Sequence, residues 1–414
     1  MQEHYELYQH SSGLTIAHYP DKSAITYAGY IVRVGAQNDP QRYFGMAHLV
    51  EHMMFKGTRL RSSKHIIQRA EEVGADINAY TTKEETFVYA AFKEQYLHRM
   101  LHLLTDVVLH SRIPEEELER EKSVIIEEIN SYKDSPSEQI FDEFEDLLFR
   151  GSSLGHNILG TVASVKRISS LSARKFIHQH YRPENMVLCL RGQVDIEYIL
   201  DFCDDYFSSY SIEKALPLRT TSLLHTVGDL PKTTYLSHKF NTYQTHCIIG
   251  GYAYSMHQEE RLVTTLLNNI LGGPGMNSRL NMSLREEKGY VYSVDSNYTP
   301  YSNAGVFTIY FGCAHKDRES AKALVFQELD RLCAEPISDK ELAAAKRQIM
   351  GQLAIAADIR ETAFLSMGKS LLFYRKYDSL STIEERLNTI TASMIQETAR
   401  KLFVPEQLLT LLYY

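Results

Sequence analysis

The chain has 414 residues, with 44 Lys and Arg against 52 Asp and Glu, so its formal net charge is −8. This acidic balance argues against a nucleic-acid-binding protein, which normally carries a positive charge. A hydrophobic content of 44% and a charged content of 23% are typical of a globular protein and exclude a disordered one. At about 150 residues per domain, the length predicts two or three domains.

The N-terminus has neither a basic start nor an apolar stretch, so we expect no signal peptide. No run of about 18 apolar residues occurs, which predicts no transmembrane helix and no membrane partner. The cysteines are scattered and never form a C-x-x-C pair, which favours reduced thiols packed as small hydrophobic side chains. They are Cys189, Cys203, Cys247, Cys313 and Cys333. A cytoplasmic location is therefore expected.

The pattern of apolar residues predicts the same order of elements in each half of the chain. In the first half we expect a strand at 25–34, helices at 45–56 and 62–73, two short strands within 77–92, and helices at 94–111 and 115–132. In the second half we expect a strand at 246–254, a helix at 258–271, a helical segment ending at Gly289, strands at 291–298 and 305–313, and helices at 317–333 and 338–356. The connection between the halves is expected within 206–230.

One local match supports an internal duplication. Glu117, Leu118 and Lys122 in the first half resemble Glu341, Leu342 and Lys346 in the second half, each 224 positions later. The sequence therefore predicts an α+β protein with two similar domains, 1–215 and 216–414, each a mostly antiparallel sheet packed with helices.

The most informative segment predicts a metal site on the first helix. His48 and His52 are four residues apart, so on a helix they lie on one face and two imidazoles can share one cation. Glu51 flanks the same face and can reach a water molecule on that cation without being a ligand. This donor set suits Zn²⁺ with an open coordination position, and H-x-x-E-H is the inverzincin signature. The alternative is two half-exposed histidines with no metal.

A third ligand is expected from the acid-rich helix that ends the first half. Glu121 and Glu128 are seven residues apart and share a stripe with Val124 and Ile125. An acid on an apolar face is costly unless it is paired or bound to a metal. We therefore predict Glu128 as the metal ligand, with Glu121 behind it orienting a ligand and so supporting catalysis. Glu127 is expected to face solvent, and a solvated charge or a salt bridge remains the alternative for Glu121.

These segments resemble the pitrilysin/insulinase family of zinc peptidases, over nearly the whole chain. GMAHLVEHMMFKGT resembles the family's zinc-helix block, and Glu128 follows His52 by 76 positions, within the family's usual interval for its distal ligand. The chain is similar to the short two-domain type, to which the beta subunit of the mitochondrial processing peptidase belongs. GADINAYTTKEETFVYAA resembles the family's edge strand, which implies that substrate is added as a strand beside Asn78, Ala79 and Tyr80.

A second block, SRL followed by LREEKGYVYS, resembles the part of the family's second domain that holds substrate. This resemblance implies that Arg285 and Tyr292 bind the substrate and stabilise the developing oxyanion. From the residues alone, a helix capped by Gly289 and followed by a Tyr-rich strand would be structural. The match departs from many relatives at Gly273–Gly275, where they carry more glycine.

The resemblance implies a zinc-dependent endopeptidase with one Zn²⁺ per chain and Glu51 as the general base. Only one of the two copies keeps metal ligands, because Gln352 stands 224 positions after Glu128 and residues 266–270 contain no His or Glu. The family's long members enclose a chamber with four domains. Two chains of this length are therefore expected to assemble, as a homodimer or as a heterodimer with a related subunit, around short or unfolded peptides.

Two other functions remain open. The chain could be a non-catalytic, core-like family member that acts as a binding or scaffold subunit, although such relatives typically lose the motif residues. It could also bind a phosphate or nucleotide at the glycine-rich segment 272–275. That second signal is weak, because no Gly-Lys-Ser/Thr follows and Pro274 has no amide hydrogen to donate.

Overall fold

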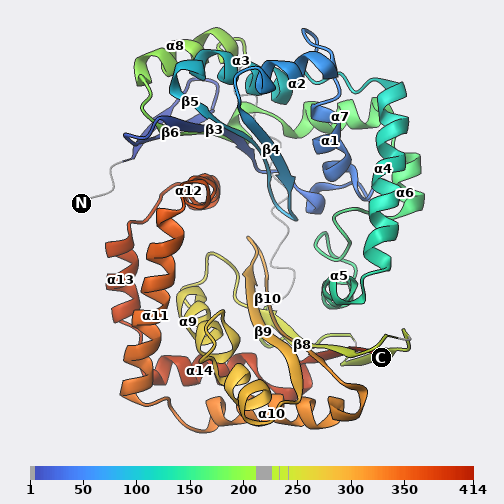
Figure 1. The fold of residues 1–414 in the computed structure, drawn as a ribbon, viewed down its shortest axis with the longest axis vertical. Helices are drawn as coiled ribbons and strands as arrows, with labels where there is room; N and C mark the ends of the chain where they lie inside the picture. Colours follow the sequence, from blue (N-terminus) through green and yellow to red (C-terminus); the bar gives the residue numbers. More distant parts are fainter. Residues whose placement is uncertain (1–4, 211–225, 233, 241) are drawn as a thin grey trace. The chain divides into compact units, whose positions relative to one another are not determined.

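A computed structural model describes residues 5–210, 226–232, 234–240 and 242–414, which form two compact units (Figure 1). Unit 1 takes the described parts of Met1–Asn130, His156–Arg219 and Ala356–Ser379. Unit 2 takes the described parts of Ser131–Gly155, Thr220–Ile355 and Leu380–Tyr414. Each unit has its own sheet and its own helices, so the fold is α+β, as predicted.

Unit 1 is built on a six-stranded sheet in the order β1-β2-β6-β3-β5-β4. Its strands are β1 (Glu6–Gln9), β2 (Thr15–Pro20), β3 (Ile25–Val32), β4 (Asp76–Thr81), β5 (Thr86–Lys93) and β6 (Met186–Gly192). The pair β2–β6 is parallel and the other neighbours are antiparallel. The expected strands at 25–34 and within 77–92 are therefore confirmed as β3, β4 and β5.

Helices cover both faces of this sheet. They are α1 (Met46–Met54), α2 (Ser63–Glu71), α3 (Leu97–His110), most of α4 (Glu115–Lys133), α6 (Val162–Arg167), α7 (Ser170–His180), α8 (Ile196–Phe207) and α12 (Arg360–Tyr374). The main core of unit 1 joins Tyr30 and Val32 of β3 with apolar residues of α1, α3, α7 and α8. Side chains alternate between the faces of a strand, so the other face needs its own cover.

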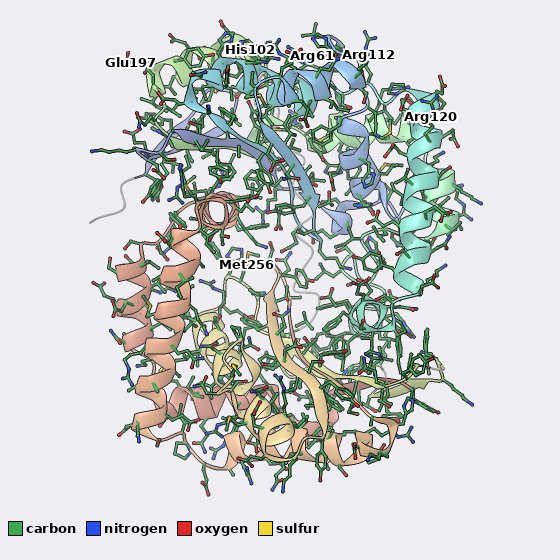
Figure 2. The ribbon with its side chains drawn as sticks, in the orientation of Figure 1. Arg61, His102, Arg112, Arg120, Glu197 and Met256 are labelled. Atoms are coloured by element: carbon green, nitrogen blue, oxygen red, sulfur yellow. The ribbon has the colours of Figure 1, made fainter. Side chains whose placement is uncertain are left out.

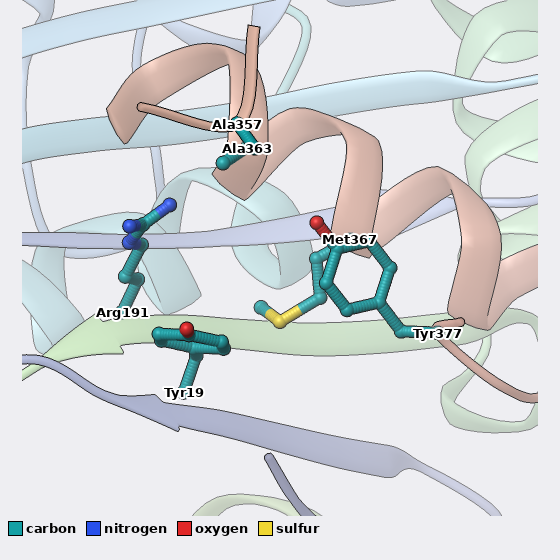
Figure 3. Close-up of a pocket in the computed structure, with 6 residues that line it drawn as sticks. All are labelled: Tyr19, Arg191, Ala357, Ala363, Met367 and Tyr377. Carbon is teal, nitrogen blue, oxygen red and sulfur yellow. The ribbon is translucent and has the colours of Figure 1, made fainter. Parts of the chain in front are cut away.

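Helix α12 provides that cover, since it packs against β3 and β6. Phe364 of α12 lies 5.4 Å from the ring of Phe87 on β5, measured between ring centroids. Near the start of the helix, Arg191 of β6 lies 4.9 Å above the ring of Tyr19 of β2, beside Met367 (Figure 3). Both faces of the central strands β3, β5 and β6 are therefore covered.

Unit 2 repeats this plan with a five-stranded sheet in the order β7-β11-β8-β10-β9. Its strands are β7 (Tyr235–His238), β8 (Thr245–Ala253), β9 (Val291–Pro300), β10 (Gly305–Cys313) and β11 (Leu409–Tyr413). The pair β7–β11 is parallel and the others are antiparallel. This sequence of pairings is the same as β2-β6-β3-β5-β4 of unit 1, which confirms the internal duplication.

The helices of unit 2 also cover both faces of its sheet. They are α5 (Pro136–Leu148), α9 (Arg261–Gly272), the π-helical segment η4 (Asn281–Glu287), α10 (Arg318–Ala334), most of α11 (Asp339–Asp358), α13 (Leu380–Asn388) and α14 (Ala392–Leu402). Cys247 and Ile249 of β8 face the core formed with α9, α10 and α14. Ile248 between them faces α5. All nine residues of β8 are consequently buried.

The matching lysines make the same kind of contact in the two units. Lys122 of α4 donates to the carbonyl of Lys166 near the end of α6, at 3.5 Å. Lys346 of α11 donates to the carbonyls of Asn388 and Ile390 at the end of α13, at 3.1 and 2.6 Å. Each lysine thus satisfies carbonyls that a helix C-terminus leaves without partners.

The compact units differ from the two contiguous domains predicted, because two segments are exchanged. Ser131–Gly155, which includes α5, belongs to unit 2, and Ala356–Ser379, which includes α12, belongs to unit 1. The predicted boundary at 215/216 and most of the expected connection lie outside the described residues, so that boundary stays a prediction. All five cysteines are free. None of the helices within the described residues is long and apolar enough to cross a bilayer.

Candidate metal centre

Helix α1 carries the H-x-x-E-H motif and starts from a tightly fixed point. The buried carboxylate of Asp39 accepts hydrogen bonds from the backbone N–H groups of Gly45 and Ala47, at 2.6 and 2.9 Å. Gly45 has a left-handed backbone (φ 90°), and a Cβ there would clash with the carbonyl of Leu159. A carboxylate at a helix N-terminus is favoured by the exposed N–H groups and the helix dipole. The position of α1 is thereby defined at its first turn.

Three side chains of α1 and α4 converge as predicted. Oε2 of Glu128 lies 3.9 Å from Nε2 of His48 and 4.0 Å from Nε2 of His52. The ligand atoms of these residues all lie within 4.8 Å of one another. Two atoms that each bind one zinc ion at about 2.0–2.2 Å are at most about 4.4 Å apart, so both carboxylate distances fit a shared ion. Two imidazoles and one carboxylate are also the donor types that zinc prefers.

Burial keeps the imidazole of His48 neutral, which is the form that can bind a metal. Burial, with a smaller effect from His52, lowers the pKa of His48 to about 3. A neutral imidazole has a free lone pair, which a metal requires. Burial raises the pKa of Glu128, while the nearby His52 lowers it. A cation at this position would compensate the cost of burying the carboxylate charge.

Glu121 was expected behind Glu128 but contacts His52 instead, and its orienting role stays a prediction. Its side chain is 9% exposed, and Oε2 lies 3.2 Å from Nδ1 of His52. Its other oxygen forms an ion pair with Lys56 at 2.7 Å. A proton on Nδ1 of His52 can donate to this carboxylate, which leaves Nε2 as the lone-pair atom directed at Glu128. The salt-bridge alternative for Glu121 is thus also realised, through Lys56.

Replacing Glu121 with Gln is expected to lower zinc affinity by about 10- to 100-fold, the usual cost of losing such a supporting partner. The amide keeps the shape but removes the charge that polarises His52. Competition with a chromogenic chelator measures the affinity. Glu119→Gln is the matched control, because Glu119 is exposed on the same helix and pairs with Lys122 instead. Equal affinity in the two variants would show that Glu121 does not support the site.

Glu51 lies beside the three ligands but is held by a different element. Thr81, the last residue of β4, donates a hydrogen bond from Oγ1 to Oε2 of Glu51 at 2.9 Å. Burial raises the pKa of the Glu51 carboxyl, and Glu128 adds to this, while the Thr81 hydrogen bond and His52 lower it. A carboxylate with a raised pKa is a better proton acceptor near neutral pH.

Strand β4 carries the three residues predicted to bind substrate, Asn78, Ala79 and Tyr80. It is the edge strand of its sheet in unit 1, paired with β5 alone (Figure 1). An edge strand presents unpaired backbone N–H and C=O groups to which an extended peptide can add. Helix α1 packs beside β4, so this edge lies next to the helix that carries Glu51.

Arg285 and Tyr292 belong to unit 2, and both are exposed. Arg285 lies on η4, with its side chain 50% exposed and 3.9 Å from the carboxylate of Glu286. Tyr292 is 69% exposed on the edge strand β9. The register there shifts, because Val291 pairs with Cys313 and Ser293 with Gly312, so Tyr292 has no partner on β10. Such bulges redirect a side chain and are common near functional sites. The roles of both residues stay predictions.

One detail of the predicted ligand helix is wrong, and three supporting residues were not predicted. Val124 is 50% exposed, so the buried stripe runs through Glu121 and Ile125 without it. The neighbouring Glu127 faces solvent, as expected. The residues missed by sequence reasoning are Asp39, Lys56 and Thr81. A threonine two positions after Ala79 lies on the same strand face, and this was the signal available for Thr81.

A second pair of histidines has the same spacing as His48 and His52 and serves as a comparison. His98 and His102 of α3 are also four residues apart, and their Nε2 atoms lie 3.2 Å apart. Figure 2 shows His102 on the side of α3 that faces away from the sheet of unit 1. Within the described part of the chain, His48, His52 and Glu128 form the one group of three or more His, Cys, Asp or Glu side chains that converge this closely. The carboxylate of Glu128 distinguishes this centre from the pair of His98 and His102.

Comparisons with known proteins match both halves of the chain. The model of the insulinase family (peptidase family M16) matches residues 15–162, and that of the peptidase M16 inactive domain matches residues 167–349. An uncharacterized zinc protease of Rickettsia bellii is 32% identical over 409 residues, which cover 97% of this chain and 96% of the relative. The uncharacterized zinc protease YmxG of Bacillus subtilis is 31% identical over 385 residues, covering 93% and 92%.

Solved structures share the fold at lower identity. A protease from Helicobacter pylori superimposes with a TM-score of 0.92 at 19% identity, covering 100% of both chains. A peptidase M16 inactive domain from Pseudomonas fluorescens gives a TM-score of 0.89 at 19% identity, covering 99% of this chain and 97% of the other. At these identities the likeness concerns the fold alone.

Proposed function

Because this chain belongs to the insulinase family of M16 peptidases, we propose that it is a zinc-dependent endopeptidase that cleaves short or unfolded peptides. The observation that carries this proposal is the convergence of His48, His52 and Glu128 beside Glu51. Relatives named zinc proteases support the metal and the reaction class. The second half, which lacks the ligands, matches the inactive-domain model, and this supports one zinc ion per chain.

In the proposed reaction, His48, His52 and Glu128 hold the zinc ion, and Glu121 fixes the ring of His52. When bound, the ion supplies Lewis-acid activation of a water molecule and of the scissile carbonyl. Glu51 accepts the proton of the attacking water on its carboxylate and then delivers it to the leaving amine nitrogen. Burial, with a smaller effect from the nearby Glu128, raises the pKa of Glu51, which suits it to this proton transfer.

The substrate is proposed to add as an extended strand along β4, beside Asn78, Ala79 and Tyr80. Backbone hydrogen bonds of this kind impose little sequence specificity, which suits a peptidase of unfolded chains. Arg285 and Tyr292 are proposed to hold the substrate and stabilise the developing oxyanion. Their exposure, and the bulge at Tyr292, support a role in binding.

A peptide-mixture assay tests this function directly. The protein purified with zinc is expected to cleave unfolded peptides of mixed sequence, and mass spectrometry reads the fragments. A chelator should abolish the cleavage and added zinc should restore it. Cleavage that resists a chelator would contradict zinc dependence. A protein that binds zinc yet cleaves no peptide would instead favour the core-like scaffold function, which is retained as the second candidate.

We further propose a homodimer in which each zinc centre works with Arg285 and Tyr292 of the other subunit; a heterodimer with a related subunit is the alternative. The support is that one chain carries both parts of the expected site, on units 1 and 2. The free cysteines are compatible with a reducing compartment, and a cytoplasmic location is part of this proposal.

Mixing two inactive variants tests the shared site. Glu51→Gln chains and Arg285→Ala chains are expected to be nearly inactive alone. After random subunit exchange, half of the dimers carry one chain of each kind and therefore one intact site, so about a quarter of the wild-type activity should return. Differently labelled chains verify the exchange. No recovery despite verified exchange would contradict sharing across a dimer.

A further inference from the structure

The hydrogen bond between Thr81 and Glu51 links the two elements on which the proposed reaction depends. Thr81 ends β4, the edge strand, while Glu51 lies on α1 among the metal-binding histidines. Oγ1 of Thr81 donates to Oε2 of Glu51 at 2.9 Å. The other carboxylate oxygen, Oε1, has no hydrogen-bond partner among the described residues. One oxygen of Glu51 is thus held by the strand, and the other is available.

The neighbouring Thr86 limits the possible partners of the Thr81 hydroxyl hydrogen to two. Thr81 lies opposite Thr86 in the pairing of β4 with β5, and their Oγ1 atoms are 3.3 Å apart. Thr86 is fully buried and donates its single hydroxyl hydrogen to the carbonyl of Val34 at 2.9 Å. Because each hydroxyl has only one hydrogen to give, Thr86 cannot donate to Thr81 and is a second possible acceptor for the Thr81 hydrogen. The carboxylate of Glu51 is the closer acceptor, at 2.9 Å against 3.3 Å, and a charged acceptor forms the stronger bond, so the Thr81 hydrogen is directed at Glu51.

The strand geometry places Thr81 on the side of β4 that faces α1. Side chains alternate along a strand, so Ile77, Ala79 and Thr81 share one face. Ile77 and Ala79 pack against the core that contains α1, which identifies this face. Asn78 and Tyr80 lie on the opposite face. The strand proposed to receive substrate therefore ends in the side chain that contacts the proton acceptor.

We propose that Thr81 is a positioning residue that holds the carboxylate of Glu51 so that Oε1 is presented for proton transfer. The inference rests on the proposed peptidase function. Because Thr81 is part of the strand that receives the peptide, any shift of this edge also moves the proton acceptor. A misplacement of about 1 Å in such a group can cost about 100-fold in rate.

Two substitutions separate positioning from a packing role. Thr81→Val keeps the size and β-branching of the side chain and removes the hydroxyl, whereas Thr81→Ser keeps the hydroxyl and removes a methyl group. We expect Thr81→Val to lower kcat by about 10- to 100-fold with little change in KM and with full zinc content. Thr81→Ser should retain most of the wild-type kcat. Wild-type kcat in the valine variant, or an equal loss in the serine variant, would overturn the inference.

A double-mutant cycle in unfolding tests the contact without any activity measurement. Denaturant midpoints are compared for the metal-free wild type, Thr81→Val, Glu51→Ala and the double variant. If the Thr81 hydroxyl and the Glu51 carboxylate interact, either substitution should shift the midpoint much less in the other variant than in the wild-type protein. Additive shifts would overturn the inference whatever the activity. If the four midpoints show coupling but the wild-type protein cleaves no peptide, the contact between Thr81 and Glu51 is kept and the proposed peptidase function is rejected.

Discussion

Replacing Glu51 with Gln is expected to leave zinc bound and to lower kcat/KM for peptide cleavage by about 10²- to 10⁴-fold, the usual contribution of a general acid–base group. The amide is close in size to the carboxylate and still accepts a hydrogen bond from Thr81, but it cannot take a proton from water. The proposed metal ligands His48, His52 and Glu128 are unchanged. Elemental analysis of the purified variant measures the zinc, and a fluorogenic peptide measures the rate.

Two controls make this result specific to proton transfer. The zinc content and the melting temperature of the Glu51→Gln variant should match those of the wild type, because no ligand is lost. A general fall in stability would point to a structural role instead. Full activity of the Glu51→Gln variant with zinc bound would show that Glu51 is not the proton acceptor and would contradict the proposed mechanism.

Replacing Glu128 with Gln is expected to have the second large effect, a loss of zinc affinity greater than about 100-fold. Losing a supporting residue behind a ligand already costs about 10- to 100-fold, and a direct ligand costs more. Activity should disappear when no zinc is added. Isothermal titration of the metal-free protein measures the affinity.

Glu127→Gln is the matched control for this variant. It makes the same chemical change one position earlier on α4, at an exposed side chain that faces away from the centre. Zinc affinity and activity should remain at wild-type levels. Folding of the Glu128→Gln protein should also persist, since burial disfavours the charge that the substitution removes. Similar losses in both variants would contradict the assignment of Glu128.

Local sequence patterns predicted the elements that carry the centre. The four-residue spacing of His48 and His52 predicted that the two side chains lie close together, because a helix places such residues on one face. Glu128 could be chosen over Glu127 because its burial follows from the helical repeat. The error at Val124 arose because a stripe drawn from spacing alone does not show how wide the covered face is.

Contacts between distant segments could not be predicted in the same way. The hydrogen bond from Thr81 to Glu51 depends on how β4 docks beside α1, and the hydrogen bonds that Asp39 accepts depend on the path of the loop before α1. Neither leaves a repeat in the sequence. The exchange of α5 and α12 was missed for a related reason: an apolar helix face shows that a partner exists but not which sheet provides it.

The exchange also sets the order in which the protein can be completed during synthesis. Ala356, which begins the last segment of unit 1, follows Asn130 by 226 positions. At about 5–20 residues per second, a ribosome needs roughly 10–45 s to make the intervening chain. During that interval the sheet of this unit has one apolar face without α12. The compact unit that contains His48, His52 and Glu128 can therefore be completed only after most of the other unit has been made.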